Sequence, residues 1–148
     1  MARIRQILFA SDLSKASMKA FVTAVTLAKA NRAMMTIVHV VTPVTPLVPE
    51  RYDRIETVQE LHVEMRRWSQ QEISKLTERA KKAGVRATGF VTEGDPGRQI
   101  VRAARSKRAD LIVMGTHGRT GLARVFVGSV AGRVVATAGC PVVTVRVT

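Results

Sequence analysis

Apolar and polar residues follow one another along this chain in two distinct rhythms. Short, nearly continuous apolar runs are typical of strands buried on both faces, whereas apolar residues at helical spacing are typical of amphipathic helices. The first rhythm predicts strands over residues 3–10, 34–41, 85–92, 110–114 and 141–147. The second predicts helices from Ser14 to about Arg32, and then over about 54–82, 96–107 and 129–138.

Glycine, proline and capping residues fall at the ends of these predicted elements. Gly84 is placed to stop the long helix, because glycine readily adopts the left-handed conformation that ends helices. Asp95 is suited to cap the next helix, with Pro96 at its first position, where a missing N–H costs nothing. Three prolines between residues 43 and 49 exclude regular structure there, so this segment is predicted to be a loop.

Strands and helices alternate throughout, without a break in composition or an internal repeat. This order predicts a single α/β domain over residues 1–148, with a mostly parallel sheet covered by helices on both faces. The apolar strands 3–10 and 110–114 are suited to the centre of that sheet. Ligands of such sheets bind beyond the carboxyl ends of the strands, where the strand order reverses. If these two strands are neighbours, the residues that follow them share one crevice.

The composition describes a globular chain. Its 148 residues are enough for one hydrophobic core, and 46% hydrophobic with 24% charged residues excludes an intrinsically disordered chain. No apolar run approaches the ~20 residues that span a bilayer, and residues 1–13 fit a strand better than a signal peptide. The single cysteine, Cys140, cannot form an internal disulfide, which fits a reducing cytoplasm.

The net charge of +13 is the other feature of the composition. From Arg98 onward one acidic residue, Asp110, is outnumbered by basic ones: Arg98, Arg102, Arg105, Lys107, Arg108, Arg119, Arg124, Arg133 and Arg146. Such a field attracts polyanions, from nucleotides to nucleic acids. A solvated arginine-rich surface explains the same charge, and with 4% aromatic residues the chain has few rings on which bases could stack.

The segment from Gly115 to Ser129 carries the strongest functional signal. It joins an apolar strand to a helix and is rich in glycine, which lets a ligand approach the backbone. The helix that follows offers unpaired N–H groups to an anion. The segment therefore predicts a phosphate site held by Gly115, Gly118, Gly128 and Ser129, with an ordinary glycine-rich connection as the alternative. Its spacing matches neither the P-loop nor the Gly-x-Gly-x-x-Gly motif.

Other polar residues accompany this segment. Arg119 is able to pair with phosphates and His117 to contact phosphate or transfer a proton, although both are equally suited to a solvated loop. Asp12 follows the first strand, where a carboxylate binds ribose hydroxyls or helps to hold a cation. The alternative role of Asp12 is to cap the first helix, for which Ser11 and Ser14 are also suited.

The sequence names no catalytic residue. No two histidines have the spacing of metal ligands, and no base stands near Cys140 in the sequence to make it a nucleophile. His39, inside an apolar strand, is expected to be a core histidine with a hydrogen-bond partner, and His62 carries little signal. The long helix is expected to bury a stripe of large apolar residues: Leu61, Met65 and Trp68.

Taken together, these segments resemble the universal stress protein family, in its single-domain, ATP-binding form. The resemblance spans nearly the whole chain, and it rests on residues 7–14, 37–41, 93–96, 110–118, 128–131 and 140–142. The glycine motif that ends in Gly-Ser is its most specific part. The resemblance implies a Rossmann-like, adenine nucleotide alpha hydrolase-like fold, which is a five-stranded parallel sheet of order 3-2-1-4-5. It also implies a homodimer formed through the C-terminal strand.

The resemblance further implies a site for ATP with Mg²⁺ or Mn²⁺. Val40 would bind adenine through its backbone, Asp12 would face the ribose, and Ala10 would line the pocket. The contacts implied around the rest of the nucleotide are Met114, Gly115, Gly118, Gly128, Ser129 and Val130. His117 and Arg119, the candidates from the same loop, complete the predicted site.

The function implied is nucleotide-dependent regulation in a stress response, by a cytoplasmic homodimer without a membrane partner. Two alternatives come from the residues themselves. The basic end of the chain fits a nucleic-acid-binding module, and metal-bridged phosphates would allow a slow ATP hydrolase.

Overall fold

Within the described residues, nine strands and helices alternate in the order that the sequence predicts. A computed structural model describes residues 3–43, 55–116 and 128–146. The strands are β1 (Gln6–Ala10), β2 (Met34–Val41), β3 (Ala87–Glu93), β4 (Leu111–Gly115) and β5 (Val142–Val145). The helices are α1 (Ser17–Asn31), α2 (Ile55–Lys82), α3 (Pro96–Ser106) and α4 (Ser129–Thr137).

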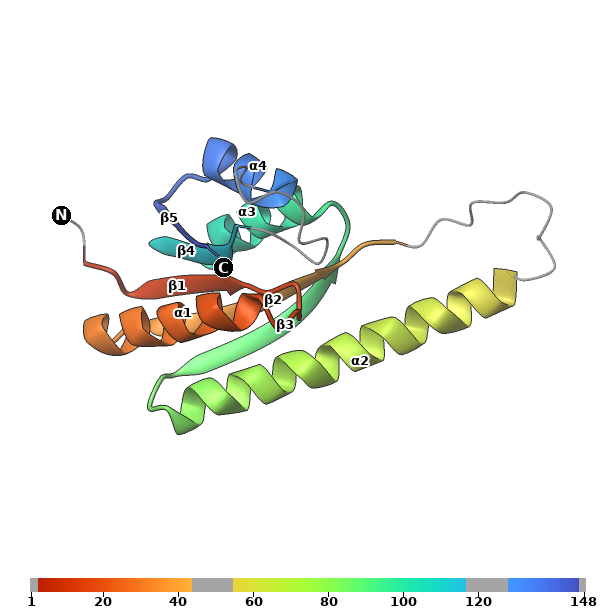
Figure 1. Cartoon of the computed structure of the whole chain (residues 1–148), viewed down its shortest axis with the longest axis horizontal. Helices are drawn as coiled ribbons and strands as arrows, with labels where there is room; N and C mark the ends of the chain where they lie inside the picture. Colours follow the sequence, from red (N-terminus) through yellow and green to blue (C-terminus); the bar gives the residue numbers. More distant parts are fainter. Residues whose placement is uncertain (1–2, 44–54, 117–127, 147–148) are drawn as a thin grey trace.

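The strands form one parallel sheet in the order β3-β2-β1-β4-β5, which confirms the predicted fold (Figure 1). β1 lies at the centre, and Ala10 at its end stands opposite Val38 of β2 and Met114 of β4. The chain first builds outward from β1 to β3, and then crosses back to add β4 and β5 on the other side. The strand order therefore reverses between β1 and β4, whose carboxyl ends lie side by side.

Both faces of the sheet are covered, by α1 and α2 on one side and by α3 and α4 on the other (Figure 1). Successive residues of β1 enter the two cores in turn: Phe9 packs on the α1–α2 side and Leu8 on the α3–α4 side. Phe9 also meets Phe21 of α1 edge to face, with ring centroids 5.7 Å apart. Burial on both faces explains why the apolar run of β1 is continuous rather than alternating.

The predicted helix ends are confirmed at α2 and α3. Asp95 accepts a hydrogen bond from the N–H of Arg98 at 3.0 Å, and Pro96 occupies the first helical position. Gly84 follows α2 with a φ of 93°, a conformation that glycine adopts without strain.

Capping of α1 by Asp12 or Ser11 is a prediction that the structure contradicts. The helix begins only at Ser17, and its N-cap residue is Ala16. Asp12 Oδ1 instead accepts the N–H of Ser14 at 2.9 Å, and Ser11 Oγ accepts that of Leu13 at 3.0 Å. These bonds hold a turn before the helix, because short polar side chains compete with helical hydrogen bonding. Only the Ser14 hydroxyl supports the helix start, accepting the N–H of Ser17 at 3.2 Å.

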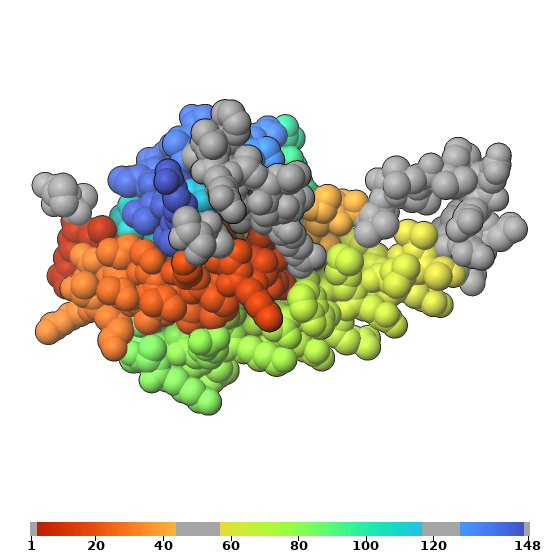
Figure 2. All heavy atoms as spheres, viewed as in Figure 1, coloured from red at the N-terminus to blue at the C-terminus, as the bar shows by residue number. Residues whose placement is uncertain are grey.

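The long helix α2 buries its apolar stripe only in its C-terminal half. Ile73 and Ala80 are buried, but Leu61, Met65 and Trp68 are 54%, 43% and 45% exposed, so their assignment to the core is wrong. The 28 residues of α2 rise about 42 Å, whereas the seven residues of β3 cover about 23 Å. The first half of α2 therefore projects past the sheet (Figures 1 and 2). No described helix, α2 included, is both long and apolar enough to cross a membrane.

Candidate ligand site

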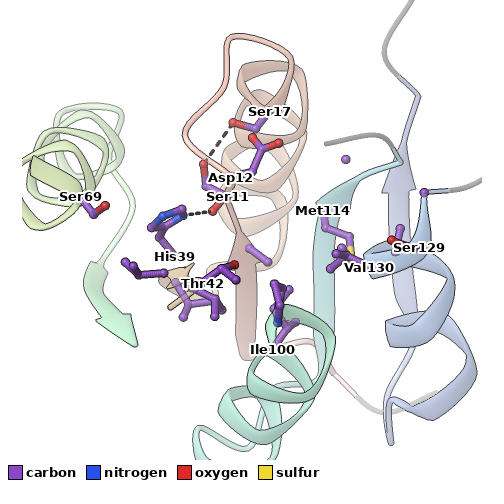
Figure 3. Close-up of a pocket in the computed structure, with 18 of the residues that line it drawn as sticks. Ser11, Asp12, Ser17, His39, Thr42, Ser69, Ile100, Met114, Ser129 and Val130 are labelled. Carbon is purple, nitrogen blue, oxygen red and sulfur yellow. Dashed lines mark hydrogen bonds between the residues drawn. The ribbon is translucent and has the colours of Figure 1, made fainter. Parts of the chain in front are cut away.

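A cavity of about 650 Å³ opens at the carboxyl ends of the strands (Figure 3). Its walls come from the ends of β1, β2 and β4, the starts of α3 and α4, and the middle of α2. This is the point at which the strand order reverses, where parallel α/β proteins bind their ligands. The sheet topology thus explains where the cavity lies.

Eight of the eleven predicted binding residues line this cavity. They are Ala10, Asp12, Val40, Met114, Gly115, Gly128, Ser129 and Val130. The strand order brings them together from segments that are far apart in the sequence. The other three, His117, Gly118 and Arg119, lie outside the described residues. Which ligand atoms each of these residues contacts stays a prediction.

The backbone of Val40 faces the cavity. Every second residue of a strand directs its N–H and C=O toward the same neighbouring strand, and the carbonyl of Val38 faces β1, accepting the N–H of Ser11 at 2.9 Å. Val40, two residues later, faces the same way. β1 pairs with β2 only as far as Val38, so no β1 residue stands opposite Val40. One donor and one acceptor are therefore offered to a ligand side by side.

The amino-terminal end of α4 borders the cavity from another direction. Gly128 is the N-cap residue of α4, and its N–H donates to the Thr116 carbonyl at 2.6 Å, which ties the helix to the end of β4. Ser129 is exposed at the first helical position, so its side chain does not cap α4. The first N–H groups of a helix have no partner within it and carry partial positive charge. This end of the cavity therefore attracts an anion.

Asp12 lines the cavity from the turn after β1. Its Oδ1 accepts hydrogen bonds from the backbone N–H and the hydroxyl of Ser14. Asp12 is the one carboxylate among the described residues that line the cavity. No group of three or more His, Cys, Asp or Glu residues in the described part of the chain could hold a metal ion.

A buried polar cluster on the α1–α2 side of the cavity is not apparent from the sequence. His39 is buried, and its Nδ1 lies 2.8 Å from the carbonyl oxygen of Ser11, which confirms the expected core histidine with a partner. The hydroxyls of Ser11 and Ser17 lie 3.1 Å apart, and all three residues line the cavity (Figure 3). The only sequence signal is a run of small polar residues after β1, which indicates capping equally well.

Residues of α2 also form part of the wall, which the sequence analysis does not predict. Met65, Trp68 and Ser69 line the cavity beside the end of β2. Their contribution depends on how α2 crosses the sheet, and helical periodicity does not specify that crossing.

His62 and Cys140, whose side chains could in principle take part in chemistry, do not line the cavity. His62 contacts Glu93, which also pairs with Arg66 at 3.2 Å, so this cluster ties α2 to the end of β3. Burial raises the pKa of the Cys140 thiol, and the negative charge of Asp110 raises it further. A raised pKa lowers the thiolate fraction at neutral pH, so Cys140 is a poor nucleophile.

The sheet order and the position of the cavity define a doubly wound parallel α/β protein with a cavity at the switch point. The family model of the universal stress proteins matches residues 3–146. The chain therefore belongs to the universal stress protein family.

Individual proteins agree with this assignment. A universal stress protein of Methanocaldococcus jannaschii is 37% identical over 142 residues, which are 96% of this chain and 82% of the relative. A universal stress protein from Lactobacillus plantarum shares the fold with a TM-score of 0.85 and 27% identity, covering 99% of this chain and 100% of its own.

Two more distant universal stress proteins were solved with bound nucleotides. One is in complex with cAMP, at a TM-score of 0.69 and 22% identity over 99% of this chain and all of its own. The other, from Archaeoglobus fulgidus, is in complex with dAMP, at a TM-score of 0.64 and 20% identity over 97% of this chain and 98% of its own.

Proposed function

We propose that this protein binds ATP in the cavity beyond β1 and β4, and that it acts as a nucleotide-dependent regulator in a stress response. One observation carries the proposal: the Val40 backbone and the amino-terminal end of α4 border the same cavity. The first suits the polar edge of a base, and the second suits a chain of phosphates. A molecule that joins a base to phosphates through a sugar is a nucleotide.

Adenine suits the Val40 side of the cavity. Its polar edge places a ring-nitrogen acceptor next to an amino donor, which match the N–H and the C=O of one backbone residue. Guanine has a carbonyl acceptor in place of that amino group, which would face the Val40 carbonyl. Ala10, Val38 and Met114 add apolar surface for the ring. The relatives solved with cAMP and dAMP hold adenine nucleotides, which supports this assignment.

The phosphates are assigned to the α4 side. Gly128 and Ser129 begin the helix there, and the predicted contacts from Gly118, Arg119 and His117 belong to the same glycine motif. Mg²⁺ or Mn²⁺ would neutralise part of the phosphate charge. The cavity suits an ion that arrives with the nucleotide, because among the described lining residues Asp12 alone offers a carboxylate oxygen.

Regulation is better supported than turnover. The Asp12 carboxylate is held by Ser14, and Nδ1 of His39 is held by the Ser11 carbonyl. These bonds fix both side chains as parts of the cavity wall. A bound nucleotide would connect the ends of three strands with two helices. A slow ATP hydrolase is the less supported alternative.

The regulated assembly is proposed to be a dimer formed through β5. This strand stands at one edge of the sheet, where its outer N–H and C=O groups are able to pair with another chain. Val145, the last residue of β5, accepts the N–H of Thr116 at 3.0 Å, and Thr116 lines the cavity. The proposed dimer contact and the proposed nucleotide site are therefore directly connected by hydrogen bonds between Thr116 and Val145.

Calorimetric titration of nucleotide-free protein with ATP and Mg²⁺ tests the site. We expect a dissociation constant on the order of micromolar, with binding lost in Gly118→Val. Gly132→Ala is the matched control, because Gly132 does not line the cavity and an added Cβ would meet nothing within 4 Å. Wild-type protein that fails to bind ATP would end this proposal. A monomer in sedimentation experiments would end only its dimer part.

A second candidate function, binding of a polyanion such as nucleic acid, is favoured by one surface of α3. Arg98, Arg102 and Arg105 are all exposed, at spacings that place them on one side of the helix. The test is binding to generic duplex DNA across a salt series. We expect affinity that falls steeply with salt and that weakens further when Arg102 and Arg105 are both replaced by alanine. Binding that ignores salt would discard this candidate.

A further inference from the structure

Ser69 of α2 has a buried hydroxyl that the described part of the protein does not use. The residue is 0% exposed, and its Oγ forms no hydrogen bond with the described residues. Hydroxyls on helices often bond to the carbonyl four residues earlier, as Thr77 of the same helix does to Ile73 at 2.8 Å. Ser69 makes no such bond. A buried polar group without a partner is costly, so it calls for an explanation.

The position of Ser69 points to a ligand. It lines the cavity with Met65 and Trp68, on the side where β2 ends at Val41 and Thr42 follows. Figure 3 shows its side chain extending from α2 toward the strand ends, on the same side as His39. Met65 and Trp68 beside it are partly exposed, and a rearrangement of side chains in this wall would open the Ser69 hydroxyl to a ligand.

We propose that Ser69 is a specificity-determining residue, whose hydroxyl bonds to the base of the bound nucleotide from the wall that α2 adds to the cavity. This inference rests on the proposed function. Val40 offers the base one donor and one acceptor, which leaves one amino hydrogen and two ring nitrogens of adenine for other partners. A serine hydroxyl is able to accept from the first or donate to the others. The Ser69 hydroxyl would then form a hydrogen bond with a polar atom of adenine that Val40 leaves without a partner.

The first experiment compares wild-type protein, Ser69→Ala and Ser74→Ala by calorimetric titration with ATP and by thermal unfolding without ligand. Ser74 is exposed on the same helix and does not line the cavity, so it is the matched control. We expect Ser69→Ala to bind ATP about five- to twentyfold more weakly, the effect of one lost hydrogen bond. Its unfolding midpoint without ligand should equal or exceed that of wild type, because the change removes a hydroxyl that had no partner. Ser74→Ala should match wild type in both measurements.

The second experiment asks whether the lost bond is to the base. The titrations are repeated with purine riboside triphosphate, 3-deaza-ATP and 7-deaza-ATP, which lack the amino group, N3 and N7 in turn. The penalty of Ser69→Ala should shrink for the analogue that lacks the atom bonded to Ser69. An equal penalty with all ligands would assign Ser69 a structural role and overturn the inference.

The remaining outcomes separate this inference from the proposed function. If wild-type protein does not bind ATP, both fail. If wild-type protein binds ATP and Ser69→Ala binds it within twofold as tightly, only the inference fails. A lowered unfolding midpoint of unliganded Ser69→Ala would show that the hydroxyl has a structural partner, which also overturns it.

Discussion

Nδ1 of His39 lies 2.8 Å from the carbonyl oxygen of Ser11, and this contact joins the end of β2 to the residue that follows β1. Because a carbonyl oxygen only accepts hydrogen bonds, Nδ1 must carry the proton. Ser11 also donates its N–H to Val38 of the same strand at 2.9 Å. Two bonds to β2 therefore hold the turn that carries Asp12 into the cavity.

We expect His39→Leu to lower the free energy of unfolding by about 1–3 kcal/mol, because it leaves a buried polar group without its partner. Denaturant unfolding measures this loss. His62→Leu is the comparison, since His62 is only half-buried and pairs with Glu93 at the surface; its loss should stay below about 1 kcal/mol. An equal fall in the free energy of unfolding in the two variants would show that the contact between His39 and Ser11 stabilises the protein no more than a surface ion pair does.

The first turn of α4 predicts the effect of Ser129→Pro. Proline is well tolerated at the first helical position, and the preceding Gly128 already has a φ of −57° and a ψ of 159°, which suit a residue before proline. The change removes one N–H and the hydroxyl at the phosphate end of the cavity. Affinity for ATP should fall roughly tenfold with the unfolding midpoint unchanged. Retention of full affinity would place the phosphates elsewhere.

Gly89 lies where β3 packs closely against α2. A Cβ added there would lie 2.5 Å from Thr77 Oγ1 and 2.6 Å from Ile73 Cγ2, both on α2. Gly89→Ala should therefore destabilise the protein by about 1–3 kcal/mol, as overpacked cores do. Gly132→Ala should instead stabilise it by about 0.5–1 kcal/mol, because Gly132 lies inside α4 with open space around it. A stabilised Gly89→Ala variant would contradict this account of how α2 packs.

The raised pKa of Cys140 predicts slow alkylation. Burial and the Asp110 charge disfavour the thiolate, which is the reactive form, so at any pH below the pKa the folded protein exposes less of it. Iodoacetamide labelling at pH 8 should be slower in the folded protein than in denaturant. When the labelling rate is followed against pH, the midpoint of its rise should lie at higher pH in the folded protein. Asp110→Asn should move the midpoint back down, because it removes the nearby negative charge. An unshifted midpoint in that variant would leave burial as the sole cause.

The sequence predicted a local structure correctly where a residue type has a single structural role at that position. Asp95 and Pro96 begin α3 as predicted, because the capping carboxylate and the fixed proline φ act within one turn. The polar residues after β1 were ambiguous, because Asp12 and Ser11 are equally able to cap a helix or to close a turn. The structure contains the turn. Propensity alone cannot choose between two local bonds of similar strength.

The sequence by itself determined the alternation of strands and helices and the parallel sheet, because these depend on periodicity. The segments after β1 and β4 also indicated Asp12, Gly115, Gly128 and Ser129 as lining residues, whereas Ala10, Val40, Met114 and Val130 were implied by the family resemblance. The tertiary structure decided the rest. How α2 crosses the sheet leaves Leu61 and Trp68 exposed and places Ser69 in the cavity wall. The end of β1 opposite Val38 is what leaves the Val40 backbone open to a ligand. The orientation of α2 and the exposure of the Val40 backbone both depend on how far one element extends along its neighbour. Because these elements are distant in the sequence, their relative positions are set only when the chain packs.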